Sequence, residues 1–191
     1  MSKNYNNYKD YKNYNNYSDA GGYKSLPFFK QAEIIYDFTV EFVKRYIDYK
    51  SRTKDQMEQA ARSGKQNIPE GYLQKSLEGR IKLLGVARGS LEELLNDYLD
   101  FIRQHGYRLW EMNDPEAKKV RAFVYNNYNN YKNYNDYITS ADKAANVMIC
   151  LINQTNRLID QKLRWLEEKF VQEGGFRENL FKKRMERRKN I

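Results

Sequence analysis

Apolar residues recur every three or four positions in four long stretches of this chain, and this spacing constrains the fold more than any other feature. Residues three and four apart lie on one face of an α-helix, so each stretch predicts a helix with one apolar side. The chain also contains only three prolines in 191 residues, and proline is the residue that most strongly interrupts helices. The stretches that we expect to be helical are 27–50, 54–74, 77–104 and 141–172.

Local signals predict where these helices begin and end. Thr53 and Gln56 have the spacing of a capping box, in which two side chains bond to free backbone amides at the start of a helix. Pro69 lies late in the second stretch and should kink or end that helix, because proline lacks an amide hydrogen. Gly174 and Gly175 should stop the fourth helix.

Small residues interrupt the second and third stretches. Glycine in a helix costs about 1 kcal/mol relative to alanine, so a compensating contact is expected at each one. We expect a neighbouring helix to approach closely at these positions, which are Ala60, Ala61, Ser63, Gly64, Gly85 and Gly89.

Four helices joined mostly by short links predict an all-α protein, an up-and-down antiparallel four-helix bundle. The long link Gly106–Ser140 precedes the fourth helix. Asp114 and Pro115 predict a short helix within this link, which we expect to end near Tyr125. The predicted organisation is a tyrosine-asparagine repeat at 1–24, the bundle at 25–172 with a repeat insertion at 125–138, and a basic tail at 173–191.

The repeat occurs twice, at Asn4–Tyr17 and Asn126–Tyr137, with a tyrosine at every third position. A step of three circles an α-helix and alternates between the faces of a strand, so we expect disorder or a loose extended form. The Asn, Tyr and Lys codons imply a nine-nucleotide repeat rich in A and T, which favours insertion by slippage. We therefore expect the fold to survive deletion of both repeats, which should lie at opposite ends of the bundle. Stacking on unpaired bases and self-association are alternatives.

The charge is concentrated at the C-terminus. The chain has a formal charge of +9, and residues 162–191 contribute ten basic and five acidic side chains. Phe176, Leu180, Phe181 and Met185 are expected on one side of a short helix there. A basic cluster of this kind predicts contact with a phosphate backbone, RNA or DNA, and the alternatives are a solvated, frayed terminus, a membrane surface or a partner groove. We expect no membrane partner, because the few apolar residues of this segment disfavour stable anchoring. The candidate nucleic-acid-binding residues are Lys182, Lys183, Arg184, Arg187, Arg188 and Lys189.

Catalytic and metal chemistry find little support in the sequence. The chain has one cysteine and one histidine, which cannot form a Cys/His metal site. Cys150 lies among apolar residues and is expected to be a buried, inert thiol, and His105 is expected at the end of a helix beside Gly106. We therefore expect a non-enzymatic protein without metal or cofactor. We also expect it to be cytoplasmic, because no signal-peptide core and no run of about 18 apolar residues is present.

Two segments, "QNIPEGYLQKS" and "LLGVARGSLEELLNDYLDF", resemble motifs of a bacterial family. The family comprises four-helix-bundle proteins first noticed as open reading frames in intervening sequences of 23S ribosomal RNA. The resemblance covers about 26–108 and, only in pattern, 141–170, and here Pro69 replaces the usual alanine. The matching residues are Asn67, Ile68, Glu70, Gly71, Tyr72, Ala87, Gly89, Ser90, Leu91, Glu93 and Leu94.

This resemblance implies a ring-like homo-oligomer such as a pentamer, with no catalytic activity. The family is also similar to accessory proteins of diversity-generating retroelements, which bind nucleic acid and a reverse transcriptase. We interpret the motif residues as structural, with Gly71 permitting close packing and Asn67, Glu70, Ser90 and Glu93 forming polar bonds within the subunit. A subunit or ligand contact is the alternative.

The sequence therefore predicts a self-associating helical bundle that binds nucleic acid, RNA in particular, through its basic tail. A structural or partner-docking module without nucleic-acid binding is the alternative.

Overall fold

The computed structural model of the chain describes residues 22–126 and 134–189. Within these residues every regular element is helical and none is a strand, which confirms the predicted all-α class. The single 3-10 turns are labelled η, and the elements in chain order are η4 (Tyr23–Ser25), α1 (Pro27–Tyr46), α2 (Arg52–Tyr72), α3 (Leu77–Gln104), α4 (Pro115–Asn126), η6 (Tyr137–Thr139), α5 (Ala141–Glu173) and α6 (Phe176–Lys189).

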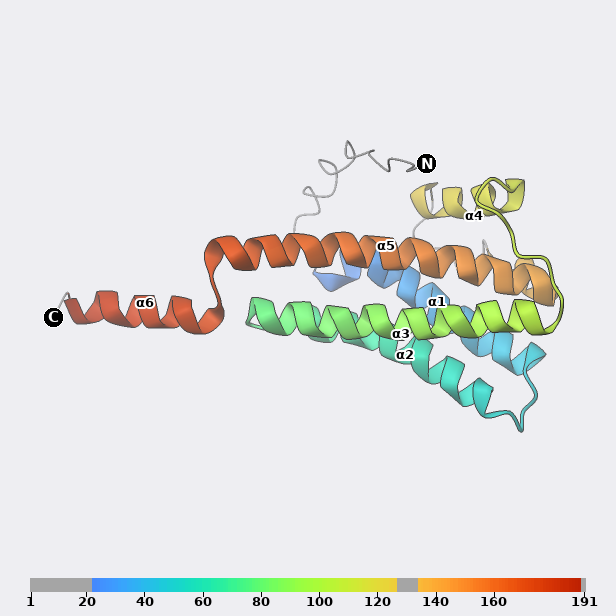
Figure 1. Cartoon of the computed structure of the whole chain (residues 1–191), viewed down its shortest axis with the longest axis horizontal. Helices are drawn as coiled ribbons and strands as arrows, with labels where there is room; N and C mark the ends of the chain where they lie inside the picture. Colours follow the sequence, from blue (N-terminus) through green and yellow to red (C-terminus); the bar gives the residue numbers. More distant parts are fainter. Residues whose placement is uncertain (1–21, 127–133, 190–191) are drawn as a thin grey trace, which may run out of the picture.

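Four of the helices surround a shared apolar core. Helix α2 packs against α1 and α3, and α5 also packs against α1 and α3 (Figure 1). Helix α4 lies against α5, near the end where α3 finishes and α5 begins. Helix α6 extends beyond the opposite end, away from the other helices (Figure 1). The largest fully buried side chains of the core include Phe38, Phe42, Met57, Leu91, Tyr98, Met148 and Ile152.

Two polar pairs are buried within this core. The hydroxyl groups of Thr39 on α1 and Tyr98 on α3 lie 3.0 Å apart, and both side chains are fully buried. Burial raises the pKa of the Tyr98 phenol well above its usual range. About two turns earlier on α1, the side-chain oxygen of Gln31 lies 2.8 Å from Thr155 Oγ1 of α5. Each pair joins two helices at one level, so the pairs favour a single register of the helices.

Helices α2 and α3 approach closely where α2 carries small residues. A Cβ added to Gly64 would lie 2.8 Å from Leu91 Cγ, and one added to Gly71 would lie 3.2 Å from Leu83 Cβ. Ser63 completes this contact, because its hydroxyl lies 2.8 Å from that of Ser90. The expectation of close packing along α2 is therefore confirmed at these positions.

The same expectation is wrong for Gly85 and Gly89. Both glycines are exposed, and a Cβ added to either would meet nothing within 4 Å. The repeat of apolar residues in α3 faces α2 and α5, whereas the two glycines lie on the opposite, outer side. Close packing within the subunit therefore does not explain them.

Several predicted boundaries also change. Helix α1 ends at Tyr46 rather than Lys50, and the carboxylate of Asp48 accepts a hydrogen bond from Lys50 N in the turn that follows. Ser51, not Thr53, caps α2, since its hydroxyl accepts from Thr53 N at 3.2 Å. Pro69 does not end α2, which continues to Tyr72. By contrast, α3 has its predicted bounds, and the Ser76 hydroxyl caps it by accepting from Gly79 N at 3.0 Å.

The end of the second tyrosine repeat is part of the core, which corrects the expectation that this repeat is dispensable. Tyr134 and Tyr137 are only 2% and 7% exposed. The Tyr134 ring lies edge-on to Phe123 at 5.9 Å, and the Tyr137 hydroxyl donates to Glu116 at 3.0 Å. Burial raises the pKa of both phenols to about 12.

A 3-10 geometry explains how a period of three can work here. A 3-10 helix has three residues per turn, so side chains three apart lie on one side, and residues 134 and 137–139 adopt this conformation. The period of three is therefore compatible with a 3-10 helix as well as with the disorder or loose extended form expected from the sequence. The first repeat and residues 127–133 lie outside the described residues.

Candidate nucleic-acid interface

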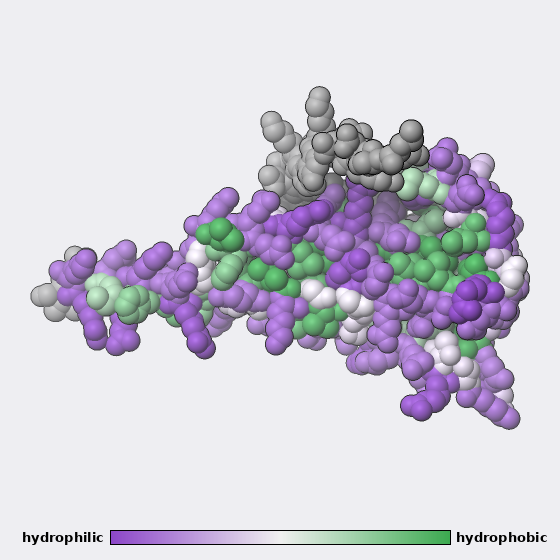
Figure 2. Space-filling view, viewed as in Figure 1, coloured by the Kyte–Doolittle hydropathy of each residue, from purple (hydrophilic) through white to green (hydrophobic). Residues whose placement is uncertain are grey.

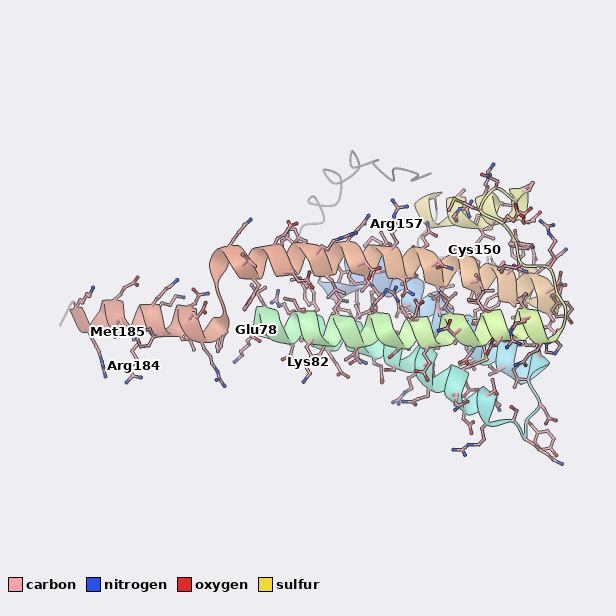
Figure 3. All side chains as sticks on the ribbon, in the orientation of Figure 1. Glu78, Lys82, Cys150, Arg157, Arg184 and Met185 are labelled. Carbon is pink, nitrogen blue, oxygen red and sulfur yellow. The ribbon has the colours of Figure 1, made fainter. Side chains whose placement is uncertain are left out.

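The predicted basic tail forms helix α6, and a glycine pair directs it away from the bundle. Gly174 has φ of +79°, a conformation that glycine adopts without strain, and its amide donates to Phe170 O at 2.9 Å. A Cβ on Gly175 would lie 2.5 Å from Glu78 Oε1 at the start of α3. Figure 3 shows Glu78 beside this turn, with Arg184 and Met185 further out on α6. The turn therefore packs against the start of α3 while α6 continues outward.

Both ends of α6 carry favourable charges. The Glu178 carboxylate accepts from Gly175 N at 2.9 Å, which places a negative group at the N-terminal end of the helix dipole. Arg187, Arg188 and Lys189 lie in the last turn, where positive charge is favourable. These end effects account for a helix in a segment that buries none of its side chains.

All six predicted basic residues lie on α6 and are exposed. With Arg177, they give seven basic against two acidic side chains in Phe176–Lys189. Within the described residues, no ion pair involves any of the six. The basic groups are consequently available to an external anion. They are Lys182, Lys183, Arg184, Arg187, Arg188 and Lys189.

The apolar side chains of α6 do not form the predicted single side. At 100° per residue, Phe176 and Leu180 lie about 40° apart, whereas Phe181 and Met185 lie about 140° to 180° from Phe176. All four are exposed, by 42%, 51%, 63% and 38% respectively. Figure 2 shows apolar atoms on this arm lying between hydrophilic ones. The helix thus has aromatic and basic groups interleaved around its surface.

Trp165 adds an exposed aromatic ring to the last part of α5. It is 38% exposed, with Lys162 Nζ 3.8 Å and Lys169 Nζ 5.1 Å from the ring centroid. Sequence reasoning did not identify this cluster. The spacing of three and four residues between the tryptophan and the lysines could have done so, because such neighbours share a helix face.

The family-motif residues lie elsewhere, along the contact between α2 and α3. Asn67 is half-buried and donates to Ser63 O at 2.9 Å. Ser90 bonds to Ser63, as described above, and also donates to Val86 O at 2.9 Å. Ile68 and Ala87 are buried in the core, as are Leu91 and Leu94. The contact between α2 and α3 therefore contains Ser90 and the four buried apolar residues, whereas the Asn67 bond stays within α2.

The remaining motif residues divide between packing and surface. Gly71 is buried against α3, and the half-buried Tyr72 lies 6.2 Å from the ring of Tyr23. Glu70, Gly89 and Glu93 are exposed, and the expected polar bonds of the Glu70 and Glu93 side chains are not found within the described residues. None of the motif residues belongs to α6, so the structure separates the motif from the basic helix.

The two candidate reactive residues occupy structural positions. His105 caps the end of α3, with Nδ1 2.9 Å from Phe101 O, as the sequence predicts for a helix end. Cys150 on α5 is half-buried rather than buried, and burial raises the pKa of its thiol. A raised pKa lowers the thiolate fraction at neutral pH, so the thiol is a weak nucleophile.

The chain matches no protein-family model, no curated protein and no solved structure. Among the described residues, no helix is both long and apolar enough to span a bilayer.

Proposed function

We propose that this chain is a non-enzymatic, self-associating helical protein that binds single-stranded nucleic acid, RNA in particular, through α6. The observation that carries the proposal is the surface of this helix, where exposed Phe176 and Phe181 lie among seven basic side chains. Basic groups attract the phosphate backbone, and exposed rings stack on unpaired bases. Bases in a duplex are already stacked, so this combination favours single strands.

In the same proposal, α1, α2, α3 and α5 form an up-and-down four-helix bundle that supports α6. The pairwise contacts of these helices support this arrangement. The absence of an enzymatic role is supported by the weakly nucleophilic Cys150 and by the hydrogen bond between the His105 ring and Phe101 O. The resemblance to the intervening-sequence family is part of the proposal and rests on the motif residues alone.

Salt dependence tests the electrostatic contribution. A fluorescently labelled single-stranded RNA is titrated with the full chain at several salt concentrations, beside DNA of the same sequence and an RNA duplex. Replacing Lys183, Arg184 and Arg187 with glutamine should reduce the slope of log K against log salt by about 2, because each single-strand phosphate contact contributes about 0.7.

A matched control replaces three exposed basic residues outside α6, Arg52, Arg62 and Lys118, with glutamine. This variant has the same net charge but should keep the original slope. Equal losses in the two triple variants would show that net charge, rather than α6, determines binding.

Stacking is tested separately with Phe181→Ala. Loss of one base–aromatic contact costs about 1–3 kcal/mol, so affinity should fall roughly five- to hundredfold while the salt slope stays unchanged. Met185→Ala removes an exposed apolar side chain without a ring from the same helix and should have a smaller effect. A full chain that binds neither RNA nor DNA at low salt would refute the proposed function.

A second candidate function, docking of a protein partner, is favoured by the exposed aliphatic side chains of Leu180 and Met185 on α6. By the family resemblance, a reverse transcriptase is one such partner. In that case the three glutamine substitutions in α6 would weaken partner binding while the chain shows no affinity for nucleic acid.

A further inference from the structure

Among the residues that the structure describes, no other helix packs extensively against α6. It buries none of its side chains, and Phe176, Leu180, Phe181 and Met185 are all exposed. Isolated helices shorter than about 12–15 residues are only marginally stable in water, and α6 has 14 residues. A contact outside the subunit would therefore stabilise this helix.

The outer side of α3 is an exposed helix face with features that suit α6. Its central part is nearly flat, because Gly85 and Gly89 leave open space and Val86 between them is 43% exposed. At 100° per residue, the acidic residues Glu93, Asp97 and Asp100 continue this side toward the end of the helix. The other charged groups on or beside this side are Glu78, Lys82 and Arg103, and Arg103 pairs with Asp100 at 2.8 Å.

One acidic group on this side is incompletely satisfied. The Asp97 Oδ2 atom is buried and has no hydrogen-bond partner within the described part of the chain. Because this oxygen is buried within its own subunit, a docked side chain would not bond to it, but a positive charge brought beside Glu93 and Asp100 would favour the ionised form of Asp97.

The two surfaces are complementary in charge and in shape. Phe176–Lys189 has a formal charge of +5, and the second half of the α3 face is acidic. The glycines would let another helix approach closely, with its apolar side chains over Val86. Two copies of α6 would repel each other because both are basic. The turn at Gly174 and Gly175 directs α6 away from its own α3 (Figure 1), so the α3 that accepts it would belong to a second copy.

We propose that α6 of one copy docks on the outer face of α3 of a second copy, with Gly85, Val86 and Gly89 under one of its two apolar pairs, Phe176 with Leu180 or Phe181 with Met185, and Glu93, Asp97 and Asp100 facing its basic side chains. The donor and acceptor surfaces differ, so reciprocal exchange would close a dimer and one-way exchange would build a larger ring or chain. This proposal rests on the proposed self-association, and because docking uses the same side chains of α6 as nucleic-acid binding, the two partners would compete for this helix.

The first test measures the mass of nucleic-acid-free full chain by light scattering at low salt. We expect a species larger than the 23.0 kDa monomer that dissociates as salt rises, because exposed charge pairs are screened. A monomer at every concentration and at low salt would refute both the self-association and the docking.

Gly89→Gln tests the contact without disturbing the subunit. The added side chain meets nothing within its own subunit and replaces a helix-breaking glycine, so thermal stability should stay equal or rise. It should nevertheless weaken assembly by at least about tenfold, because the docked helix can no longer approach closely. Unchanged assembly in Gly89→Gln would overturn the proposed contact even if the chain is an oligomer.

Charge reversal gives a test with rescue. The variant Glu93→Lys with Asp100→Lys should lose assembly, and so should Arg184→Glu with Arg187→Glu. A mixture of the two variants should assemble again, because each α6 then meets an α3 of opposite charge. Failure of the mixture to assemble would overturn the docking geometry.

The matched control is Glu33→Lys with Asp37→Lys, which reverses two exposed acidic residues four positions apart on α1. It should leave assembly unchanged. If it weakens assembly as much as reversal on α3, the attraction is general and the α3 face is not the acceptor.

Discussion

The same substitution, glycine to alanine, should have opposite effects at Gly64 and Gly89. Both glycines lie inside helices, so alanine gains about 1 kcal/mol of helix propensity at either position. At Gly89 the new methyl group meets nothing within 4 Å, and this gain should appear in full. We therefore expect Gly89→Ala to raise the free energy of unfolding by about 0.5–1 kcal/mol.

At Gly64 the new methyl group would lie 2.8 Å from both Cγ and Cδ2 of Leu91. Leu91 is fully buried, so it can move only by displacing other core side chains. Overpacking of this kind costs about 1–3 kcal/mol, which equals or exceeds the gain in propensity. Gly64→Ala should therefore lower the free energy of unfolding by about 0–2 kcal/mol.

Urea unfolding followed by circular dichroism measures the difference between the two variants. High salt and low protein concentration keep assembly from contributing. We expect the two free energies of unfolding to differ by about 1–3 kcal/mol, with Gly89→Ala the more stable. Equal destabilisation by both substitutions would refute the conclusion that the outer side of α3 is open within the subunit.

Three further substitutions test other features of the fold. Asp97 has a pKa raised to about 6 by burial and by Glu93 and Asp100, so its ionised form destabilises the fold above that pH. Asp97→Asn should therefore raise the free energy of unfolding by about 1 kcal/mol near pH 7. This is less than the full rise in the Asp97 pKa implies, because the side chain is half-exposed. The gain should disappear as the pH falls below about 4, where the carboxyl group is protonated in both the folded and the unfolded chain. Tyr134→Ala should cost about 2–4 kcal/mol in chemical unfolding, whereas Tyr49→Ala, at a residue 79% exposed, should cost less than about 0.5 kcal/mol. Tyr98→Phe removes the hydroxyl that pairs with the buried Thr39 hydroxyl, so the free energy of unfolding should fall by about 1 kcal/mol in chemical unfolding. An unchanged free energy of unfolding would show that this pair does not stabilise the fold.

Regular periodicity made the helices predictable, and local chemistry decided where they deviate. Helix α3 has its predicted bounds because its apolar repeat continues from Leu77 to Ile102 on the side opposite Gly85 and Gly89. Helix α1 ends early because its last predicted residues include Asp48, whose carboxylate bonds to Lys50 N and supports a turn. Pro69 was expected to interrupt α2, but packing of that helix against α3 outweighs the local penalty.

The candidate site was only partly predictable. Charge density identified the basic residues of α6, since this property depends on composition alone. Exposure depends on what packs against a helix, so the sequence could not show that Phe176 and Phe181 remain uncovered. It also assigned Gly85 and Gly89 to an internal contact from residue type alone, whereas at 100° per residue both glycines lie opposite the apolar side of α3.

The 3-10 conformation at the end of the second repeat has a consequence for how its length can change. Tyr134 and Tyr137 are buried three residues apart, and Tyr134 packs on Phe123 while Tyr137 packs on Trp110. In a 3-10 helix one residue corresponds to about 120°, so adding or removing one residue between the two tyrosines would turn one ring away from its partner. A coding repeat of nine nucleotides changes the protein only in units of three residues, so a change in its copy number keeps this spacing.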